Sequence, residues 1–289
     1  MCRLFGFRSV IRSQVHRSLV SAENALSVQS ERHPDGWGVA YYVGGAPHLI
    51  KSADTAVSDR LFHRVSGIVS SETVLAHLRK ATQGRLSPVN AHPFQYGRWV
   101  FAHNGNVAGF TDLRDELMAS VHPEMRRWIL GETDSELLFY LLLTRMRERH
   151  ELHAPDYPAT EVARAVQEVV HEVTSLTGGL SSDLSLGSDG TYLTFLLTNG
   201  ATLVAHHGGM PLYYSTWKRR CPERDLCPSF GPSCEAAAPN GVVNHLIFSS
   251  EPLQGENVWL DMDVGQIIAI DHRMRVHMCG HSSAPSVMI

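Results

Sequence analysis

The order of apolar patterns along this chain constrains its fold most: strand-like runs come first, two long helical patterns follow, and strand-like runs return. The early strands are predicted at 2–8, 39–43, 48–51, 73–78 and 99–103, and the late ones at 192–197, 202–206, 245–249, 266–270 and 274–278. Between them, a capping box at Thr133–Glu136 opens one helix, and 160–176 carries the apolar stripe of another. Helices grouped between strands, rather than alternating with each strand, predict sheets packed in layers with helices outside.

Shorter elements complete this prediction. Helices are expected over 18–30 and 58–66, and Asn199-Gly200 is typical of a type I′ hairpin turn. We expect one domain over 1–280, with an insertion rich in Pro, Cys and Ser near 217–241 and a C-terminal tail at 281–289.

Composition excludes several classes of protein. Of 289 residues, 43% are hydrophobic and 19% charged, which is the composition of a globular protein. The net charge of −4 comes without a block of Lys or Arg, so nucleic acid is not an expected partner. No apolar run is long enough for a membrane span, and Arg3, Arg8 and Arg12 interrupt any signal peptide. Five cysteines, an odd number, do not form a secreted disulfide framework, so we expect a cytoplasmic protein with reduced thiols.

Cys2 stands directly after Met1 and opens an apolar run. If Met1 is removed, Cys2 carries both a thiol and a free α-amine, whose ordinary pKa of roughly 7.7–8.0 leaves a useful fraction unprotonated at neutral pH. An N-terminal amine can activate a nucleophile on the same residue. Cys2 is therefore a candidate nucleophile, and the alternative is an inert cysteine in the first strand.

A few polar residues at the ends of predicted elements can form a site beside this thiol. They are Arg79 after one strand, Asn104 and Gly105 after another, and Asp134 at the start of a helix. A guanidinium binds a carboxylate bidentately, a carboxylate pairs with an ammonium, and an Asn amide with the next backbone N–H makes a two-donor oxyanion hole. Each residue alone also has an ordinary role, as a structural ion pair, a turn or a helix start. As a set, they predict a substrate that is zwitterionic at one end and an amide at the other.

Five motifs in this order resemble the class II glutamine amidotransferases, which are N-terminal-nucleophile hydrolases. The motifs are CRLFG (2–6), HLRKAT (77–82), NAHPF (90–94), HNG (103–105) and TDSE (133–136). The resemblance covers essentially the whole chain. It implies a mixed α/β (α+β) fold, a four-layer αββα sandwich, with residues 1–280 as a type-2 glutamine amidotransferase domain.

The resemblance also implies roles for the site residues. It makes Cys2 the nucleophile with its α-amine as base, and makes Asn104 and Gly105 the oxyanion hole. It assigns the α-carboxylate of glutamine to Arg79 and the α-ammonium to Asp134, and gives Thr82 and His92 pocket-lining or supporting positions. No cofactor and no metal are expected.

Two segments resemble the standalone branch of this family, which includes the γ-glutamyl amidohydrolases of ergothioneine synthesis and of glutathione breakdown. They are HPDGWG (33–38) and SSEPL (249–253). Lys80 departs from the sugar-phosphate members, which carry tryptophan after the arginine. The recognisable domain uses nearly all residues, so we expect no synthase domain on this chain.

The expected function is hydrolysis of the γ-amide of glutamine or of a γ-glutamyl compound through a cysteine thioester. The expected partner is this small-molecule substrate. One alternative is a glutaminase subunit that delivers ammonia to a separate synthase, and a separate peptidase subunit is another conceivable partner. A binding protein that keeps the fold without catalysis is a third possibility, against which the complete set of site residues argues.

Two further groups of residues suggest alternative sites, a metal site and a histidine base. Cys221, Cys227 and Cys234 have the spacing C-x5-C-x6-C, wider than the roughly two to four residues usual within zinc-ligand pairs, so a metal site is disfavoured even with His206 and His207 available. Histidines at 63, 77, 92 and 103 fall near the motifs, which makes a histidine base the main rival to the α-amine. Because side chains alternate along a strand, His103 is predicted to face away from Asn104.

Overall fold

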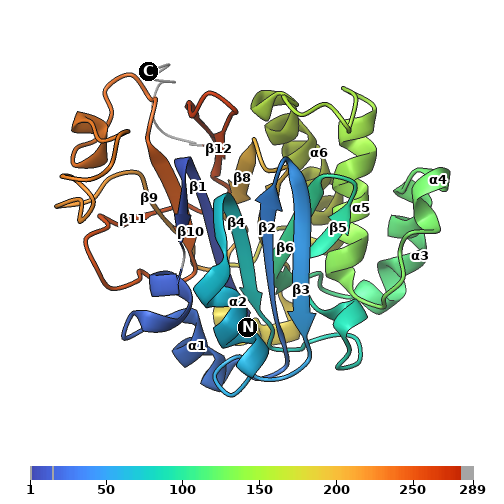
Figure 1. Cartoon of the computed structure of the whole chain (residues 1–289). Helices are drawn as coiled ribbons and strands as arrows, with labels where there is room; N and C mark the ends of the chain where they lie inside the picture. Colours follow the sequence, from blue (N-terminus) through green and yellow to red (C-terminus); the bar gives the residue numbers. More distant parts are fainter. Residues whose placement is uncertain (1, 15, 281–289) are drawn as a thin grey trace.

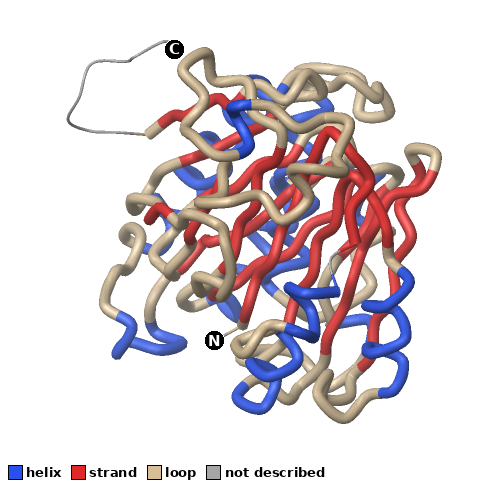
Figure 2. The backbone as a smooth tube through the Cα atoms, turned by 60° about the vertical axis from the view of Figure 1, so that its left-hand side comes forward, coloured by secondary structure: helices blue, strands red, loops and turns tan. Residues whose placement is uncertain are grey.

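Two antiparallel sheets face each other in the computed structural model, which describes residues 2–14 and 16–280 (Figures 1 and 2). The seven-stranded sheet has the order β11-β9-β10-β1-β4-β2-β3, and the six-stranded sheet has the order β13-β12-β8-β7-β6-β5. The strands are β1 (Arg3–Gln14), β2 (Trp37–Val43), β3 (Ala46–Ser52), β4 (Ser70–Leu78), β5 (Phe94–Tyr96), β6 (Trp99–Asn106), β7 (Tyr192–Thr198), β8 (Leu203–His206), β9 (Tyr213–Ser215), β10 (His245–Ser249), β11 (Leu260–Asp261), β12 (Ile267–Ile270) and β13 (Val276–Cys279).

Helices cover the outer face of each sheet, which confirms the predicted layers. The helices are α1 (Leu26–Gln29), α2 (Arg60–Ile68), α3 (Phe110–Ser120), α4 (Pro123–Arg126), α5 (Asp134–Arg147) and α6 (Ala159–Thr177). Short turns of other helix types are η1 (Arg17–Ser21), η2 (Ser30–Arg32), η3 (Pro88–Asn90), η4 (Leu184–Asp189) and η5 (Pro232–Cys234). α1 and α2 lie on the seven-stranded sheet, and α5 and α6 lie on the six-stranded one (Figure 1). None of the helices within the described residues has both the length and the apolar character needed to span a membrane.

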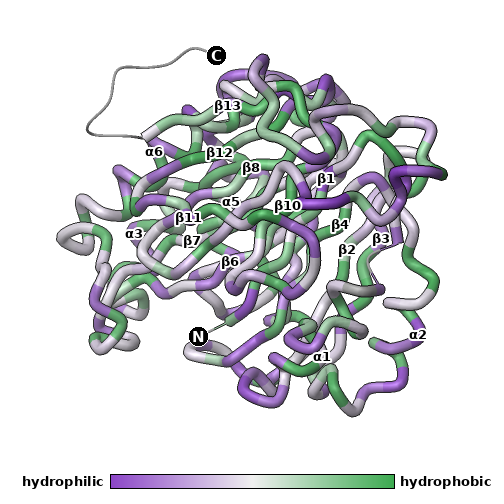
Figure 3. Tube along the Cα trace, turned by 90° about the vertical axis from the view of Figure 1, so that its left-hand side faces the viewer, coloured by the Kyte–Doolittle hydropathy of each residue, from purple (hydrophilic) through white to green (hydrophobic). Residues whose placement is uncertain are grey.

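Alternation along the strands sorts side chains between the layers. In β1, Leu4 packs in the core between the sheets, while Phe5 packs against the helices outside. In β6, Ala102 belongs to the core between the sheets, while Phe101 packs toward α5. Figure 3 shows the hydrophobic residues concentrated along the strands and the hydrophilic ones in the surrounding loops. Even-numbered residues of both strands therefore face the space between the sheets.

The two long helices begin and run as predicted. Thr133 is the N-cap of α5, and its hydroxyl accepts a hydrogen bond from the amide of Glu136 at 3.2 Å. α6 buries Val162, Val166 and Val169 on one face. These helices make the outer layer on which the six-stranded sheet rests.

Two local predictions are wrong. The segment 18–30 is not one helix, because Ala25 is extended and Asn24 bonds to the distant loop at Pro252 (2.8 Å), so only η1 and α1 form there. The helix α3 was not predicted, since only Phe110 and Leu117 of its polar sequence are buried.

The second wrong prediction is the type I′ turn at Asn199-Gly200. That turn needs a left-handed φ at both central residues, and only Gly200 has one (92°). Instead, β7 and β8 are joined by the four residues 199–202, and the side chain of Asn199 accepts from the amides of Ala201 and Thr202 at 3.0 and 2.8 Å.

The predicted domain division remains a prediction. Segment 217–241 lies between β9 and β10 and consists of turns, η5 and a bridge between Lys218 and Asn257. The expected tail, 281–289, and the expected removal of Met1 both concern residues outside those that the structure describes.

Candidate active site

Cys2 and Arg79 meet where β1 begins and β4 ends. The antiparallel register sets Arg3 opposite Leu78, so the residue before β1 lies beside the residues after β4. The Sγ atom of Cys2 is 3.3 Å from the amide nitrogen and 3.5 Å from the carbonyl oxygen of Lys80. Strand register alone therefore brings the candidate nucleophile to the segment that carries Arg79.

The second sheet reaches the same place through a histidine. Nε2 of His77, in β4, is 3.2 Å from the carbonyl oxygen of His103, in β6. This bond joins the two sheets one residue before Asn104. As predicted, the His103 ring lies on the α5 side of its sheet, where it contacts Ser135.

The environment of Cys2 keeps its thiol protonated at neutral pH. Burial raises the pKa of the Cys2 thiol, and the amide of Lys80 and the charge of Arg79 oppose that effect. Attack by sulfur therefore requires a base. Among the described residues, no histidine nitrogen lies within hydrogen-bonding distance of Sγ.

Asn104 is a buried amide without partners. Its side chain is in a residue only 1% exposed, and neither Oδ1 nor Nδ2 has a hydrogen bond within the described part of the chain. An unmade buried hydrogen bond costs about 1–3 kcal/mol, so such a group calls for an explanation. The next residue, Gly105, has no room for a side chain, because a Cβ there would lie 1.9 Å from the carbonyl oxygen of Tyr192.

Arg79 is a buried cation without a carboxylate. It is 3% exposed, and its guanidinium donates to the carbonyl oxygens of Gln83 (2.9 Å), Gly84 (3.3 Å) and Arg85 (3.1 Å). No carboxylate of residues 2–14 or 16–280 lies within ion-pairing distance of it. The loop thus orients the guanidinium but leaves its charge unpaired.

The 33–38 turn holds the backbone around Arg79. The amide of Arg79 donates to the carbonyl of Gly36 at 2.8 Å, and the amide of Asp35 donates to the carbonyl of Arg79 at 3.1 Å. The carboxylate of Asp35 accepts from the amide of Ala81 at 2.8 Å. Sequence reasoning used this turn only as a mark of one branch of a family, and its supporting role depends on contacts that no local pattern reveals.

Asp134 is a buried anion without a cation. It is 4% exposed and is the first residue of α5. Its Oδ2 accepts from the amide of Val107 at 2.8 Å, and its Oδ1 accepts from the amide of Ser135 at 2.7 Å. Within the described residues no Lys, Arg or His nitrogen pairs with it. These bonds fix the carboxylate and leave its charge without a counter-ion among the described residues.

The two supporting positions differ. His92 is buried, its ring centroid is 4.2 Å from that of His77, and neither ring nitrogen has a partner among the described residues. Burial holds the pKa of His92 well below its usual value, so the ring is neutral. Thr82 lies exposed in the loop that supplies the carbonyls around Arg79, and its role remains a prediction.

The cysteine group offers no metal-like arrangement. Sγ of Cys234 accepts from Nδ2 of Asn244 at 2.9 Å, and Nδ1 of His206 is 2.7 Å from the carbonyl oxygen of Leu193. In the part of the chain that the structure describes, no three His, Cys, Asp or Glu residues are grouped as metal ligands would be.

Comparison with known proteins assigns this arrangement to a family. The sequence model of "Glutamine amidotransferases class-II" matches residues 1–287. The glutamine amidotransferase homologue YafJ of Escherichia coli is 28% identical over 92% of this chain and 96% of its own length. The gamma-glutamyl-hercynylcysteine sulfoxide hydrolase of Mycobacterium tuberculosis is 35% identical over 37% of this chain and 50% of its own length. This chain spans 40% to 63% of the length of three other curated relatives, from Methanocaldococcus jannaschii, Saccharomyces cerevisiae and Haemophilus influenzae.

A solved structure agrees at the level of the fold. The glutamine aminotransferase class-II domain protein of Silicibacter pomeroyi superposes with a TM-score of 0.60 over 98% of this chain and 100% of that one, at 20% identity. The two proteins therefore share the fold described above, in which two facing antiparallel sheets lie between helices.

Proposed function

This chain belongs to the class II glutamine amidotransferases, a family of enzymes, and on that premise we propose that it hydrolyses the γ-amide of glutamine or of a γ-glutamyl compound through a thioester on Cys2. The observation that carries the proposal is the buried, unpaired amide of Asn104. A buried donor kept without a partner suits an oxyanion that exists only during the reaction.

Two more unpaired groups support an amino-acid head group as the ligand. Arg79 lacks a carboxylate and Asp134 lacks a cation among the described residues, and both are buried. The charges of both act on the Cys2 thiol, so the two groups lie near the candidate nucleophile. One zwitterion, bound by its α-carboxylate and its α-ammonium, satisfies both at once.

The reaction then proceeds in two steps. The α-amine of Cys2, freed by removal of Met1, takes the thiol proton, and the sulfur attacks the γ-carbonyl carbon. Nδ2 of Asn104 and the N–H of Gly105 stabilise the resulting oxyanion. The C–N bond breaks, and the leaving amine takes the proton from the α-ammonium of Cys2. Water then attacks the thioester carbonyl carbon, the C–S bond breaks, one water proton passes through the α-amine of Cys2 to the departing thiolate, and the γ-glutamyl group leaves as free glutamate.

The described histidines support the amine as base. Both ring nitrogens of His103 are engaged, by Ser135 (2.9 Å) and by the carbonyl oxygen of Tyr192 (2.9 Å). His77 faces a backbone carbonyl, and no histidine of the described residues bonds to Sγ. The histidine-base alternative therefore has no residue in position.

A relative favours a γ-glutamyl compound over glutamine as the substrate. The Mycobacterium tuberculosis hydrolase named above acts on a γ-glutamyl amide and matches this chain at 35% identity. We therefore place the amine product in the solvent rather than in a synthase.

Labelling and mass measurement test this function. The protein should begin at Cys2, and an electrophilic glutamine analogue should label that residue alone among the five cysteines. Cys2→Ala should abolish labelling and turnover, whereas Cys279→Ala, a change of a half-buried cysteine in β13, serves as the matched control and should leave both intact. Labelling that survives Cys2→Ala, or full activity in a protein that retains Met1, would refute the mechanism.

Substrate choice is tested separately. Purified protein should release glutamate from at least one γ-glutamyl thiol-containing compound faster than from glutamine. If glutamine is turned over faster than every such compound, and a candidate synthase accelerates that turnover, the ammonia-donor alternative replaces this proposal.

A further inference from the structure

A chain of three buried side chains lies behind the carboxylate of Asp134. Nε2 of His103 is 2.9 Å from the carbonyl oxygen of Tyr192, and its Nδ1 is 2.9 Å from Oγ of Ser135. The same Oγ is 3.1 Å from Oδ1 of Asp134. His103, Ser135 and Asp134 are all at most 5% exposed, so solvent does not compete for these contacts.

The hydroxyl of Ser135 has one proton and two acceptors. A backbone carbonyl can only accept, so Tyr192 requires the proton of neutral His103 to be on Nε2. Nδ1 then carries a lone pair and accepts a hydrogen bond from the Ser135 hydroxyl. In this arrangement the hydroxyl cannot also donate to Asp134, and Oδ1 keeps only the bond from the Ser135 amide, at 2.7 Å.

We propose that His103 and Ser135 are positioning residues that keep Asp134 free to receive the α-ammonium of the substrate. Because the Ser135 hydroxyl donates its hydrogen bond to His103, it does not donate to Oδ1 of Asp134. A lone pair of Oδ1 therefore stays available for the ligand. The inference rests on the proposed function, because it takes Asp134 as the ammonium site. It adds two residues that contact no substrate yet set how strongly the head group binds.

Protonation of His103 reverses the arrangement. An imidazolium donates from both nitrogens, so Nδ1–H would donate to Oγ, and the hydroxyl would turn to Asp134. Burial lowers the pKa of His103, which favours the neutral ring, although the nearby charge of Asp134 opposes this effect. The other titratable groups near His103 are His77 on β4, His92 after η3 and His206 on β8, and a charge on His103 lowers the pKa of each of these rings.

The first test replaces His103 with Gln. Its amide nitrogen can take the place of Nε2 and donate to the carbonyl oxygen of Tyr192, but its amide oxygen does not then take the place of Nδ1. The Ser135 hydroxyl therefore loses its acceptor at this position and turns to Asp134. Since a hydrogen bond to a charged group is worth about 1.5–3 kcal/mol, KM for glutamine should rise roughly tenfold with kcat within a factor of about three. His206→Gln, a change of a buried histidine in β8 of the same sheet, is the control and should leave KM unchanged.

The second test adds Ser135→Ala to this variant. With the hydroxyl removed, nothing caps Asp134, so the double variant should recover a KM within about threefold of the wild type. A merely structural role would make the two changes add. A double variant no better than His103→Gln, or a loss in kcat at constant KM, would overturn the inference.

The single variant Ser135→Ala gives a readout that does not depend on His103→Gln folding. In the wild type, KM for glutamine should rise on acidification as His103 is protonated, and in Ser135→Ala this rise should be absent. Ser175→Ala, an exposed serine of α6, is the control and should keep the rise. Identical pH profiles in wild type and Ser135→Ala would contradict the proposal.

Asp134→Asn separates this inference from the proposed function. It should raise KM for glutamine but not for glutaramate, which lacks the α-amine. If Asp134→Asn leaves KM for glutamine unchanged, the assignment of the substrate ammonium to Asp134 is wrong. If it acts as expected and His103→Gln does not, only the positioning role fails.

Discussion

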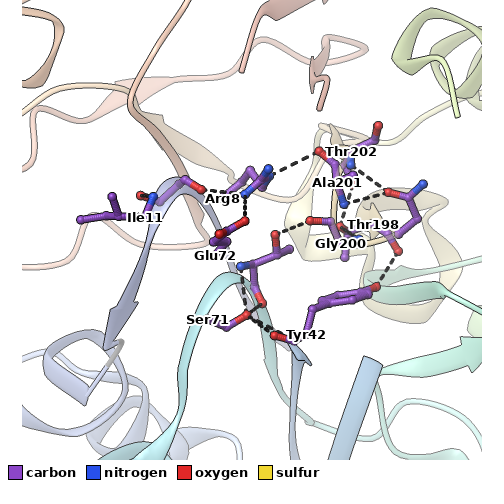
Figure 4. A network of polar contacts seen from close by, with 12 residues as sticks. Arg8, Ile11, Tyr42, Ser71, Glu72, Thr198, Gly200, Ala201 and Thr202 are labelled. Atoms are coloured by element: carbon purple, nitrogen blue, oxygen red, sulfur yellow. Dashed lines mark hydrogen bonds and ion pairs between the residues drawn. The ribbon is translucent and has the colours of Figure 1, made fainter. Parts of the chain in front are cut away.

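The end of the sandwich remote from Cys2 offers a comparison with the site, because the same strands end there and polar groups are buried there too (Figure 4). Oη of Tyr42 is 2.8 Å from the carbonyl oxygen of Arg98 and 3.1 Å from that of Thr198. The hydroxyl of Thr73 donates to the carbonyl of Gly200 at 2.6 Å, and Nε of Arg8 donates to the carbonyl of Ala201 at 3.3 Å. These bonds join the two sheets.

At the site end, the buried polar groups are left incomplete. Asn104 has no partner, Arg79 has no carboxylate and Asp134 has no cation among the described residues. Both ends have similar burial and the same strands, so the difference lies in how completely the protein itself supplies the partners. At the remote end, Asn199 accepts two hydrogen bonds at Oδ1 although its Nδ2 has none within the described part of the chain, whereas neither polar atom of the Asn104 side chain is paired there. The remote end uses its polar groups for stability, and on the function proposed above the site end keeps them for a ligand.

The largest effect is expected from two asparagines, one at each end. Asn104→Ala should lower kcat by roughly 10²–10³, the usual loss for one oxyanion donor, with little change in KM. Its free energy of unfolding should not fall, because an unpaired buried amide is removed. Asn199→Ala should do the opposite, costing about 1–3 kcal/mol of stability with kcat intact, since two amides lose their acceptor. Urea denaturation and steady-state kinetics measure both, and a destabilised Asn104→Ala protein of normal kcat would break the comparison.

Two arginines provide the next contrast. Arg79→Lys should lower kcat/KM by about 10- to 100-fold although the charge is kept, because the bidentate fork is lost. Arg8 is also buried, and its guanidinium donates to the backbone carbonyls of Ser9 and Ala201. Arg8→Lys should therefore lower the free energy of unfolding and leave kcat/KM unchanged. Equal activity losses in the two variants would mean that Arg79 acts through the fold rather than through the substrate.

Two tyrosines of β2 test the remote end alone. Tyr42→Phe should lower the free energy of unfolding by about 1–3 kcal/mol, because buried carbonyls of Arg98 and Thr198 lose their donor, while kcat/KM stays constant. Tyr41→Phe is the matched control: this half-buried tyrosine stacks on His48, and its hydroxyl has no hydrogen bond among the described residues. We expect its unfolding midpoint to equal that of the wild type, and a Tyr42→Phe protein of unchanged midpoint would show that the network contributes no stability.

The smallest effect concerns pH. Burial lowers the pKa of His77 to about 3 and that of His92 well below its usual value. The unfolded chain binds a proton at each below about pH 6.5, so it binds more protons than the folded state and stability falls as pH drops. The slope is at most about 1.4 kcal/mol per pH unit for each histidine. Denaturation at pH 7.5 and 5.5 should show a shallower decline for His77→Gln than for the wild type or for His48→Gln at an exposed site in β3. Parallel declines would exclude the site-end histidines as the cause.

The sequence predicted the layers and the places of most strands well, because these follow from local patterns. The Thr133–Glu136 capping box indicated the start of α5, and Arg79 follows β4 as predicted. The end of β6 was wrong: the strand continues to Asn106, so Asn104 and Gly105 lie within it rather than after it. The same logic failed at 18–30, where Asn24 bonds to Pro252, far along the chain.

Whether each site residue has a hydrogen-bond partner within the protein could not be predicted from the sequence. The Asn104 side chain has no partner among the described residues, whereas the side-chain oxygen of Asn199 accepts from two amides. This difference depends on which strands face each other, and the motif sequences do not reveal it. Ser135 was likewise read only as a member of a capping box, although it lies between His103 and Asp134. Roles carried by two residues distant in sequence need the tertiary structure.

The place of β1 in its sheet bears on how the enzyme matures. β1 lies between β4 and β10, so Phe5 pairs with both Ala76 and Ser249. The second of these contacts closes a loop of most of the chain, and such contacts form late in folding. The candidate nucleophile, just ahead of β1, meets Lys80 through the β1–β4 pairing, and the β1–β10 pairing then places β1 inside the sheet. On the proposed mechanism, the thiol gains its oxyanion and head-group receptors, which lie on β6 and α5, only when the two sheets have packed together.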